Sequence, residues 1–279
     1  MSAEQGVLRN WRPGWALVLL MLVVAGSFGF HAWLLASQVQ DHQRSAVIFE
    51  QSLQASIDQF EYLPALLARD EGVQARLSGK QSDPDRLHED LEFAAMRSGA
   101  DRIYVLDING TVAAASNYRE DVSFVGQNYG YRPYFADAVE TRERQFYFAK
   151  GATTGIPGLF ISAPVIVSDQ VAGVVVVKLE LTSLLASWKL ARDQVLVADS
   201  NGVVILAPEA RWMYQLVRSM NTATREALQQ ARQFPGERHG LLYQQVRSNN
   251  VWLPQQTELW TIGNVSWLVD HVSLADTGW

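Results

Sequence analysis

The chain has 279 residues, a formal net charge of −6 and 48% hydrophobic residues. This length suffices for about two domains, and the negative charge argues against nucleic acid or an acidic membrane surface as a partner of the whole chain. The absence of cysteine excludes disulfides, thiolate metal sites and a thiol nucleophile.

Residues 15–37 form an apolar stretch without Asp, Glu, Lys or Arg. It is long enough for a helix that crosses a hydrocarbon layer of ~30 Å. A cleaved signal peptide is the alternative, but the apolar region of such a peptide usually has only about 7–15 residues. Arg9 and Arg12 precede the stretch, so the positive-inside rule predicts that residues 1–14 are cytoplasmic and the remainder extracytoplasmic.

Residues 40–77 have the spacing of an amphipathic helix, in which Pro64 predicts a kink or a break. The helix either packs on a domain or acts as a dimerising stalk, and its stripe is too short and irregular to establish a coiled coil. The apolar residues that recur at intervals of three and four are Phe49, Leu53, Ile57, Phe60, Leu63 and Leu67.

A turn-rich linker, Ser78 to Asp85, follows the stalk. Pro84 can open the next helix with Asp83 as its cap, and Ser98-Gly99 predicts where that helix stops.

The clearest regularity is a repeated strand–turn–strand pattern. DRIYVLDINGTV at 101–112 and DQVLVADSNGVV at 193–204 agree at a constant offset of 92 residues. Each contains Asp-x-Asn-Gly, and Asn-Gly tolerates the positive φ of a tight hairpin. Asp107 and Asp199 are interpreted as turn formers. Two such hairpins at one offset predict duplicated α+β modules, with coincidence between two generic hairpins as the alternative.

Several further elements are predicted around these hairpins. The predicted helices begin near Pro133 and span Leu184–Ala191 and Asn221–Gln233, and the predicted strands are Gln145–Lys150, Gly158–Val165, Val171–Leu181, Gly240–Val246, Val251–Leu253, Thr257–Ile262 and Val265–Leu274. The chain stops at a turn followed by Trp279, which predicts a fragment.

Alternation along Val171–Leu181 predicts two different faces. Val174, Val176, Lys178 and Glu180 share one face, whereas the odd-numbered residues from Val175 onward are apolar. Lys178 is therefore expected in the wall of a half-apolar pocket.

Polar groups that can hold a small anion concentrate between Ser123 and Leu181. An arginine fork can bind a carboxylate through two hydrogen bonds, and a lysine adds a point charge. Arg132 and Lys178 can therefore each hold one end of a dicarboxylate. The candidate groups are Tyr129, Tyr131, Arg132, Tyr134, Thr153, Thr154, Ser162 and Lys178.

Each candidate has a structural alternative. Arg132 can pair with Asp137 or Glu140 on the following helix, and Lys178 can reach solvent from the end of a strand. The tyrosines can be core or rim residues, and Thr153 and Thr154 can simply shape a loop. Spacing alone supports only an anion pocket.

Motifs for catalysis were sought without result: the sequence contains no GxSxG, no HExxH and no phosphate-binding glycine loop after a strand. The five histidines lack the spacing of metal ligands. No catalytic residue, cofactor site or metal site is predicted in this chain, and enzyme activity is left open.

Four segments together resemble a known family. SGADRIYVLDINGTVAAASN, SFVGQNYGYRPYFADA, TTGIPGLFISAPV and GVVVVKLELTSLLASW are similar to the extracytoplasmic sensor of DctB-type C4-dicarboxylate histidine kinases. The resemblance covers about Phe60 to Leu216 and is weaker from there to Trp279.

This resemblance implies an α+β double Cache fold of tandem PAS-like modules after the membrane helix and the stalk. Residues 78–185 are expected to form the membrane-distal, ligand-binding module, and residues 186–279 a truncated membrane-proximal module. Tyr129, Arg132 and Lys178 match positions that the family uses on the dicarboxylate, and Thr154 and Ser162 are expected neighbours.

The resemblance further implies a homodimeric sensor in the bacterial inner membrane, with its N-terminus in the cytoplasm and its sensor domain in the periplasm. The expected ligand is succinate, fumarate or malate, and the expected role is regulation of their transport. ATP and the response regulator belong to a kinase core that this chain lacks. The alternative is a Cache sensor of a diguanylate cyclase or chemoreceptor, or one that binds another small carboxylate or an amino acid. An amino acid calls for an acidic partner, which no Asp in the cluster supplies.

Overall fold

The computed structural model describes residues 21–23, 26–27, 45, 47–80, 83–181, 185–186, 188, 194–243, 245–247 and 258–269. The chain divides into two compact units, one of Ala46–Gln244 with Val272–Trp279 and one of Met1–Ser45 with Gln245–His271. The predicted membrane span at 15–37 lies almost entirely outside the described residues. Within the described ranges, no helix has both the length and the apolar character to cross a membrane.

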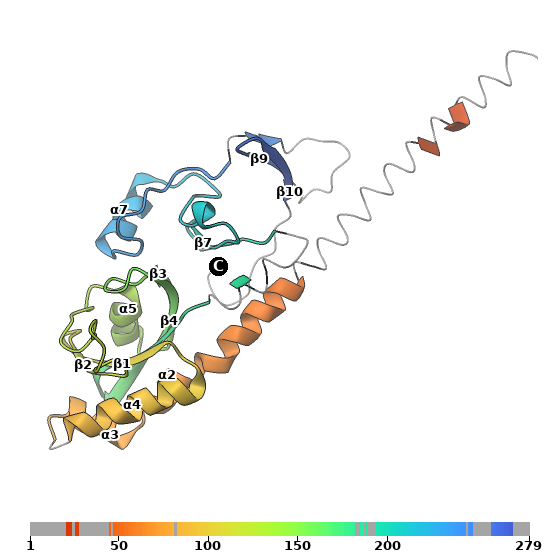
Figure 1. Ribbon diagram of the computed structural model, residues 1–279. Helices are drawn as coiled ribbons and strands as arrows, with labels where there is room; N and C mark the ends of the chain where they lie inside the picture. Colours follow the sequence, from red (N-terminus) through yellow and green to blue (C-terminus); the bar gives the residue numbers. More distant parts are fainter. Residues whose placement is uncertain are drawn as a thin grey trace, which may run out of the picture. The chain divides into compact units, whose positions relative to one another are not determined.

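The larger unit contains a five-stranded antiparallel sheet in the order β2-β1-β5-β4-β3 (Figure 1). Its β4–β5 hairpin turns at Ser168 and Asp169, which both have positive φ, as a tight two-residue turn requires. The predicted strands of this region are therefore confirmed. Their observed bounds are β1 Arg102–Asp107, β2 Val112–Ala115, β3 Gln145–Lys150, β4 Pro157–Val167 and β5 Gln170–Leu179.

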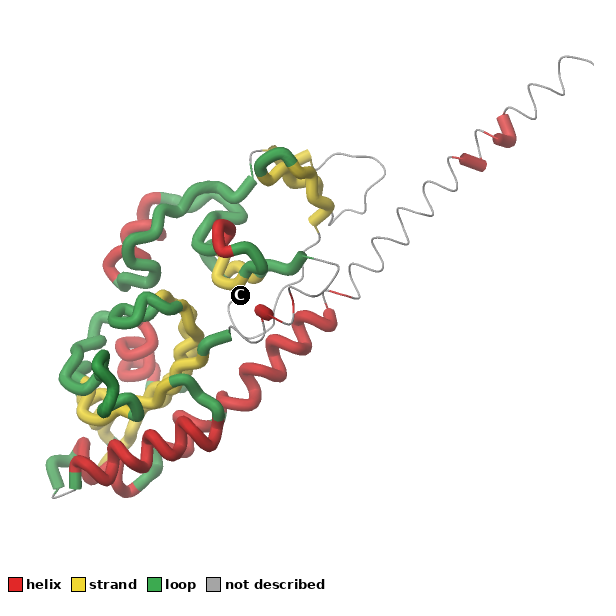
Figure 2. The backbone as a smooth tube through the Cα atoms, viewed as in Figure 1, coloured by secondary structure: helices red, strands yellow, loops and turns green. Residues whose placement is uncertain are grey.

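Helices cover both faces of this sheet (Figure 2). α2 (Leu63–Leu67), α3 (Glu71–Leu77) and α4 (Pro84–Ser98) pack on one face, and α5 (Pro133–Thr141) packs on the other. The sheet is thus buried on both sides.

The predicted stalk helix is interrupted twice. Residues 47–61 are helical and bury Leu53 and Ile57. Pro64 lies in the first turn of α2, so the first break falls where proline predicts it. The second break, at Asp70, was not predicted. The Asp70 carboxylate accepts hydrogen bonds from two backbone N–H groups of α3 and caps that helix.

Both predicted ends of α4 are confirmed. The Asp83 carboxylate accepts a hydrogen bond from the Asp85 N–H over 3.1 Å, and Gly99 ends the helix with a φ of 81°. Glycine is favoured at such a position because it has no Cβ to clash in the left-handed region.

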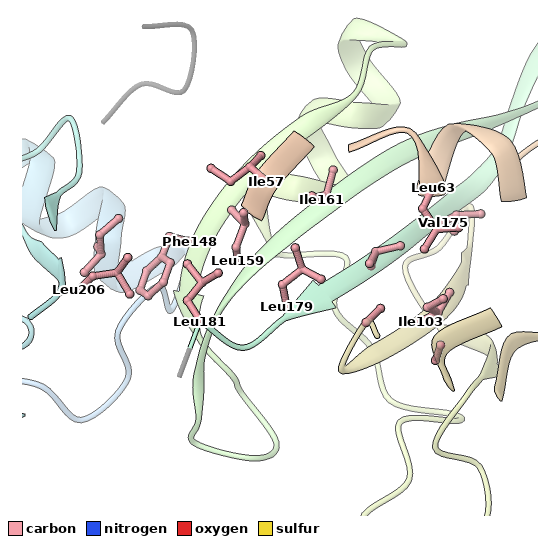
Figure 3. Packing of buried hydrophobic residues seen from close by; sticks show 14 of the residues in the cluster. Ile57, Leu63, Ile103, Phe148, Leu159, Ile161, Val175, Leu179, Leu181 and Leu206 are labelled. Atoms are coloured by element: carbon pink, nitrogen blue, oxygen red, sulfur yellow. The ribbon is translucent and has the colours of Figure 1, made fainter. Parts of the chain in front are cut away.

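The alternation predicted along β5 is also confirmed. Val175, Val177 and Leu179 join the core beneath α2 and α4, where Ile57, Leu63 and Ile103 also lie, as Figure 3 shows. Val174 and Val176 join the aromatic core beneath α5. Residues on alternate sides of one strand therefore build two separate cores.

Gly173 is a point where the sheet leaves no room for a side chain. A Cβ there would overlap the carbonyl oxygen of Leu106 on β1 and would lie 2.9 Å from Cδ1 of Leu77. Gly173→Ala should therefore force β1 and β5 apart. We expect a loss of about 2–3 kcal/mol in unfolding free energy, a fall of roughly 5–10 °C in Tm. Thermal unfolding of Gly173→Ala measures this loss, with Ala172→Ser, at the half-buried preceding residue, as the control. An unchanged Tm in Gly173→Ala would contradict the close contact between β1 and β5 at Gly173.

The two Asp-x-Asn-Gly turns have matching hydrogen bonds. In each, one aspartate Oδ1 accepts from the N–H groups two and four residues later, at 2.9 and 2.9 Å for Asp107 and 2.9 and 2.8 Å for Asp199. Gly110 and Gly202 have φ values of 78° and 81° and donate to the carbonyl of the respective aspartate. Both aspartates are turn formers, as predicted. Such detailed agreement supports duplication, although the module boundaries at 78–185 and 186–279 stay a prediction.

The second hairpin leads into smaller elements. The predicted helix after Asn221 is confirmed but stops earlier, at Gln230, and Asn221 caps it. Most residues of the predicted connecting helix at 184–191 lie outside the described residues. The predicted strand at 251–253 also lies outside them. The remaining elements are β6 Val197–Ala198, β7 Val204–Leu206, the 3-10 turn η1 Ala210–Trp212 and α7 Thr222–Gln230 in the larger unit, and β8 Gln245–Arg247, β9 Glu258–Ile262 and β10 Val265–Val269 in the smaller one.

Candidate ligand-binding site

A small pocket lies on the α5 side of the sheet, between aromatic side chains and the loop that follows β3. Its cavity volume is about 10 Å³, roughly enough for one water molecule. The lining side chains therefore leave very little free space in the pocket. It is lined by Tyr104, Phe124, Tyr129, Arg132, Tyr134, Gly151, Ala152, Thr153, Thr154, Phe160 and Lys178.

The fold brings four of the five predicted ligand-binding residues to this pocket, namely Tyr129, Arg132, Thr154 and Lys178. Ser162 does not line it. Ser162 is fully buried, and its hydroxyl donates to the carbonyl of Tyr134 over 2.7 Å. In this structure Ser162 therefore ties β4 to α5.

Arg132 is held in the pocket wall by the start of α5. It precedes Pro133 and has extended backbone angles of −80° and 134°, as expected for a residue before proline. The buried guanidinium donates from Nη1 to the carbonyl of Arg232 over 2.7 Å and from Nη2 to the carbonyl of Lys150 over 3.0 Å. The alternative in which it pairs with Asp137 or Glu140 is not observed.

Those two carbonyls connect the pocket to the segment after α7. The backbone N–H of Lys150 donates to the carbonyl of Gln233 over 2.9 Å, and Gln233 Nε2 donates to the carbonyl of Phe148 over 2.8 Å. The Lys150 ammonium also binds Glu237 over 2.5 Å. Arg132 thus belongs both to the pocket and to the junction between β3 and residues 232–237.

Lys178 is buried, and its solvent-reaching alternative is wrong. The side chain is 1% exposed, and Nζ lies 2.8 Å from Asp101 Oδ2 and 2.9 Å from Glu180 Oε1. These carboxylates compensate a charge that would otherwise be costly to bury. No role was predicted for either acid, although Glu180 follows Lys178 at i+2 on the same strand face.

The formal charges of Arg132, Lys178, Asp101 and Glu180 cancel, and Arg102 also pairs with Asp101 over 3.0 Å. Arg132 and Lys178 supply two positive charges, and Asp101 and Glu180 supply two negative ones next to Lys178. Neither acid lines the pocket itself. An entering anion would therefore meet both cations directly, but would compete with the two carboxylates for the ammonium of Lys178.

Tyrosine hydroxyls provide neutral donors in the same space. The Tyr104 hydroxyl donates to that of Tyr134 over 2.8 Å, and the Tyr129 hydroxyl lies 2.6 Å from Thr153 Oγ1. Burial raises the pKa of Tyr104, Tyr129 and Tyr134 above the usual tyrosine value. Because their hydroxyls remain protonated at neutral pH, they can donate to a carboxylate without repelling it.

The loop after β3 closes the pocket. Gly151 and Gly155 hydrogen-bond across it, and Thr154 Oγ1 accepts from the Ile156 N–H over 3.3 Å. The threonines therefore shape this loop, as their structural alternative proposed, while they also line the pocket. Among the described residues, no group of three or more His, Cys, Asp or Glu side chains is placed to hold a metal ion.

Comparisons with known proteins show what the whole chain is similar to. No protein-family profile matches the chain. The C4-dicarboxylate transport sensor protein DctB of Pseudomonas aeruginosa is 28% identical over 289 residues, which is 100% of this chain and 44% of that protein. Its namesake from Rhizobium meliloti is 33% identical over 206 residues, 73% of this chain and 33% of that protein. The chain is a homologue of DctB sensor proteins.

The fold agrees with this homology. The crystal structure of the sensor domain of the V. cholerae histidine kinase DctB has a TM-score of 0.76 and 25% sequence identity, and the match covers 87% of this chain and 94% of that one. The predicted α+β sensor fold of DctB is therefore confirmed. The chain spans less than half the length of the two full-length DctB relatives.

Proposed function

We propose that this chain is the extracytoplasmic sensor portion of a two-component histidine kinase and that it binds C4-dicarboxylates such as succinate, fumarate or malate. The observation that carries the proposal is the meeting of two buried cations, Arg132 and Lys178, in one aromatic pocket of a DctB homologue. One carboxylate of the ligand would take the fork of Arg132 and the other the ammonium of Lys178, with Tyr129 and Thr154 as neutral donors.

Binding requires the pocket to open. A cavity of about 10 Å³ is far smaller than the ~300–1,000 Å³ of typical small-molecule sites. Arg132 must release or share the carbonyls of Lys150 and Arg232, and Lys178 must share its ammonium with Asp101 and Glu180. Ligand binding would in this way change the junction at residues 232–237, and so bias one arrangement of the sensor over another.

The intact protein would regulate transport of the same dicarboxylates from the bacterial inner membrane, with its N-terminus in the cytoplasm and its sensor domain in the periplasm. We expect a homodimer, with a kinase core beyond this chain that binds ATP and phosphorylates a response regulator. These assignments extend the homology with DctB proteins.

The structure also bears on an amino-acid ligand. The sequence predicted no acidic partner for an ammonium group, whereas Asp101 and Glu180 lie beside Lys178 in the fold. Both acids already bind the Lys178 ammonium, and neither lines the pocket. This arrangement favours a dicarboxylate over an amino acid.

Thermal unfolding of the full chain in detergent micelles tests the proposal. Succinate, malate or fumarate at about 100 times its dissociation constant should stabilise the fold by about 2.7 kcal/mol and raise Tm by several degrees. Alanine and serine serve as ligand controls. A shift with the amino acids and none with the dicarboxylates would reject the proposal in favour of an amino-acid sensor.

A further inference from the structure

A second, larger groove lies beside α7. Its volume is about 480 Å³, within the range of small-molecule sites. The groove and the pocket share no lining residue. Among the residues that form it are three arginines, Arg225, Arg232 and Arg238, together with His239 and the apolar side chains of Leu228 and Phe234.

The local backbone brings these groups together. Arg225 and Leu228 are three residues apart in α7, so they share a helical face. The helix ends at Gln230 with Ala231 as its C-cap, after which Arg232 has a φ of 47° and the chain reverses. Gly236, with a φ of 79°, is a second residue in the left-handed region. Arg238 follows it and also lines the groove.

The positive charge of the groove is largely uncompensated. Arg225 and Arg238 form no ion pair with any residue that the structure describes, and Arg232 stacks its guanidinium over the Tyr131 ring at 4.7 Å. Glu237 is the acidic residue of the lining, and it binds the ammonium of Lys150 over 2.5 Å. Three guanidinium groups thus gather in a chain whose net charge is −6.

The apolar side chains of the groove can contact the carbon atoms of a ligand. Leu228 and Phe234 are buried beneath it and present apolar surface. His239 Nδ1 lies 2.8 Å from the carbonyl of Tyr214. Because a carbonyl only accepts hydrogen bonds, Nδ1 must carry the proton, which fixes the tautomer of a neutral imidazole.

We propose that this groove is a second anion site, which binds a small polyvalent anion that carries carboxylate or phosphate groups. Each arginine presents a planar fork that matches either group through two hydrogen bonds, and neighbouring unpaired cations repel one another until an anion neutralises them. The proposal does not depend on which ligand occupies the pocket, because the two sites share no lining residue.

Isothermal titration of the full chain in detergent micelles with citrate and, separately, inorganic phosphate tests this site at low ionic strength. We expect saturable binding of at least one probe, weakened at least ~10-fold by Arg225→Gln/Arg238→Gln. Binding of citrate alone assigns carboxylates, and binding of phosphate alone assigns phosphates. The matched control is Arg97→Gln, an exposed arginine at the end of α4, which should leave binding unchanged.

Two outcomes would overturn the second site: no saturable binding of either probe at millimolar concentration, or equal affinity in the double variant and the unaltered chain. Because the substituted arginines are not in the pocket, the thermal shift with succinate should be the same in the double variant. Failure of the dicarboxylate proposal would instead appear as a missing succinate shift in the unaltered chain, so the two failures are distinguishable.

Discussion

Arg132→Ala is expected to abolish dicarboxylate binding and to lower the thermal stability of the chain. For the ligand, truncation of one partner of a buried charge pair costs about 2–5 kcal/mol, which corresponds to roughly 30-fold to about 5,000-fold in affinity. Titration calorimetry with succinate measures this loss. The guanidinium is one of the two buried cations of the pocket, so no other arginine can replace it there.

The stability effect of the same variant follows from the backbone partners of Arg132. Its removal leaves the carbonyls of Lys150 and Arg232 without this donor. An unsatisfied buried acceptor costs about 1–3 kcal/mol, and these hydrogen bonds are only partly buried, so we expect a total loss of roughly 2–4 kcal/mol, about 5–12 °C in Tm. Arg132→Lys keeps the charge but loses the fork, and should recover little of either effect.

Arg97→Ala is the matched control for Arg132, because Arg97 is exposed and lies outside the pocket. It should change neither affinity nor Tm appreciably. Wild-type affinity in Arg132→Ala would remove this residue from the binding site. Wild-type Tm would show that the two backbone hydrogen bonds contribute nothing to the junction.

Lys178→Met should also lose dicarboxylate binding, with a smaller cost in stability. The substitution removes the cation beside Glu180 and leaves Asp101 with Arg102, whose Nη1 lies 3.0 Å from Asp101 Oδ1. Loss of one partner from a fully buried pair costs about 3–5 kcal/mol. Because the acids are 18% and 27% exposed, water screens part of this cost, and we expect about 2 kcal/mol, a fall of roughly 4–8 °C in Tm.

A triple variant separates the two roles of Lys178. Lys178→Met/Asp101→Asn/Glu180→Gln removes the repelling carboxylates together with the ammonium, so it should regain most of the lost stability and still fail to bind succinate. Lys80→Met, at an exposed lysine, is the control. Succinate binding by the triple variant at wild-type affinity would exclude Lys178 as a ligand group, and an unchanged Tm in Lys178→Met would contradict the described ion pairs.

The helix ends and turns were predictable because they depend on neighbouring residues. Asp83 and Gly99 limit α4 as their positions predict, and Asp107 and Asp199 form equivalent turns. A cap or a tight turn closes its hydrogen bonds within a few residues. The break at Asp70 is equally local, because the Asp70 side chain caps α3, but it was not predicted.

The partners of Arg132 were not predictable in this way. The sequence offered Asp137 and Glu140 as nearby acids, yet the guanidinium binds two backbone carbonyls, one of them 100 residues away. Every residue carries a carbonyl, so residue types give no signal for such a partner. The presence of Asp101 beside Lys178 likewise depends on the pairing of β1 with β5, across 77 residues.

The sequence by itself determined the order of most described helices and strands, the alternation that directs Lys178 toward the α5 side of the sheet, and the resemblance to DctB sensors. Each of these follows from periodicity, turn chemistry or motif order, which are local properties of the chain. Only the tertiary structure decided that the pocket is nearly closed, that acidic residues share Lys178, and that Ser162 lies outside the lining. Those facts depend on contacts between segments far apart in the chain, where side-chain volume and backbone hydrogen bonds, rather than residue pattern, select the partner.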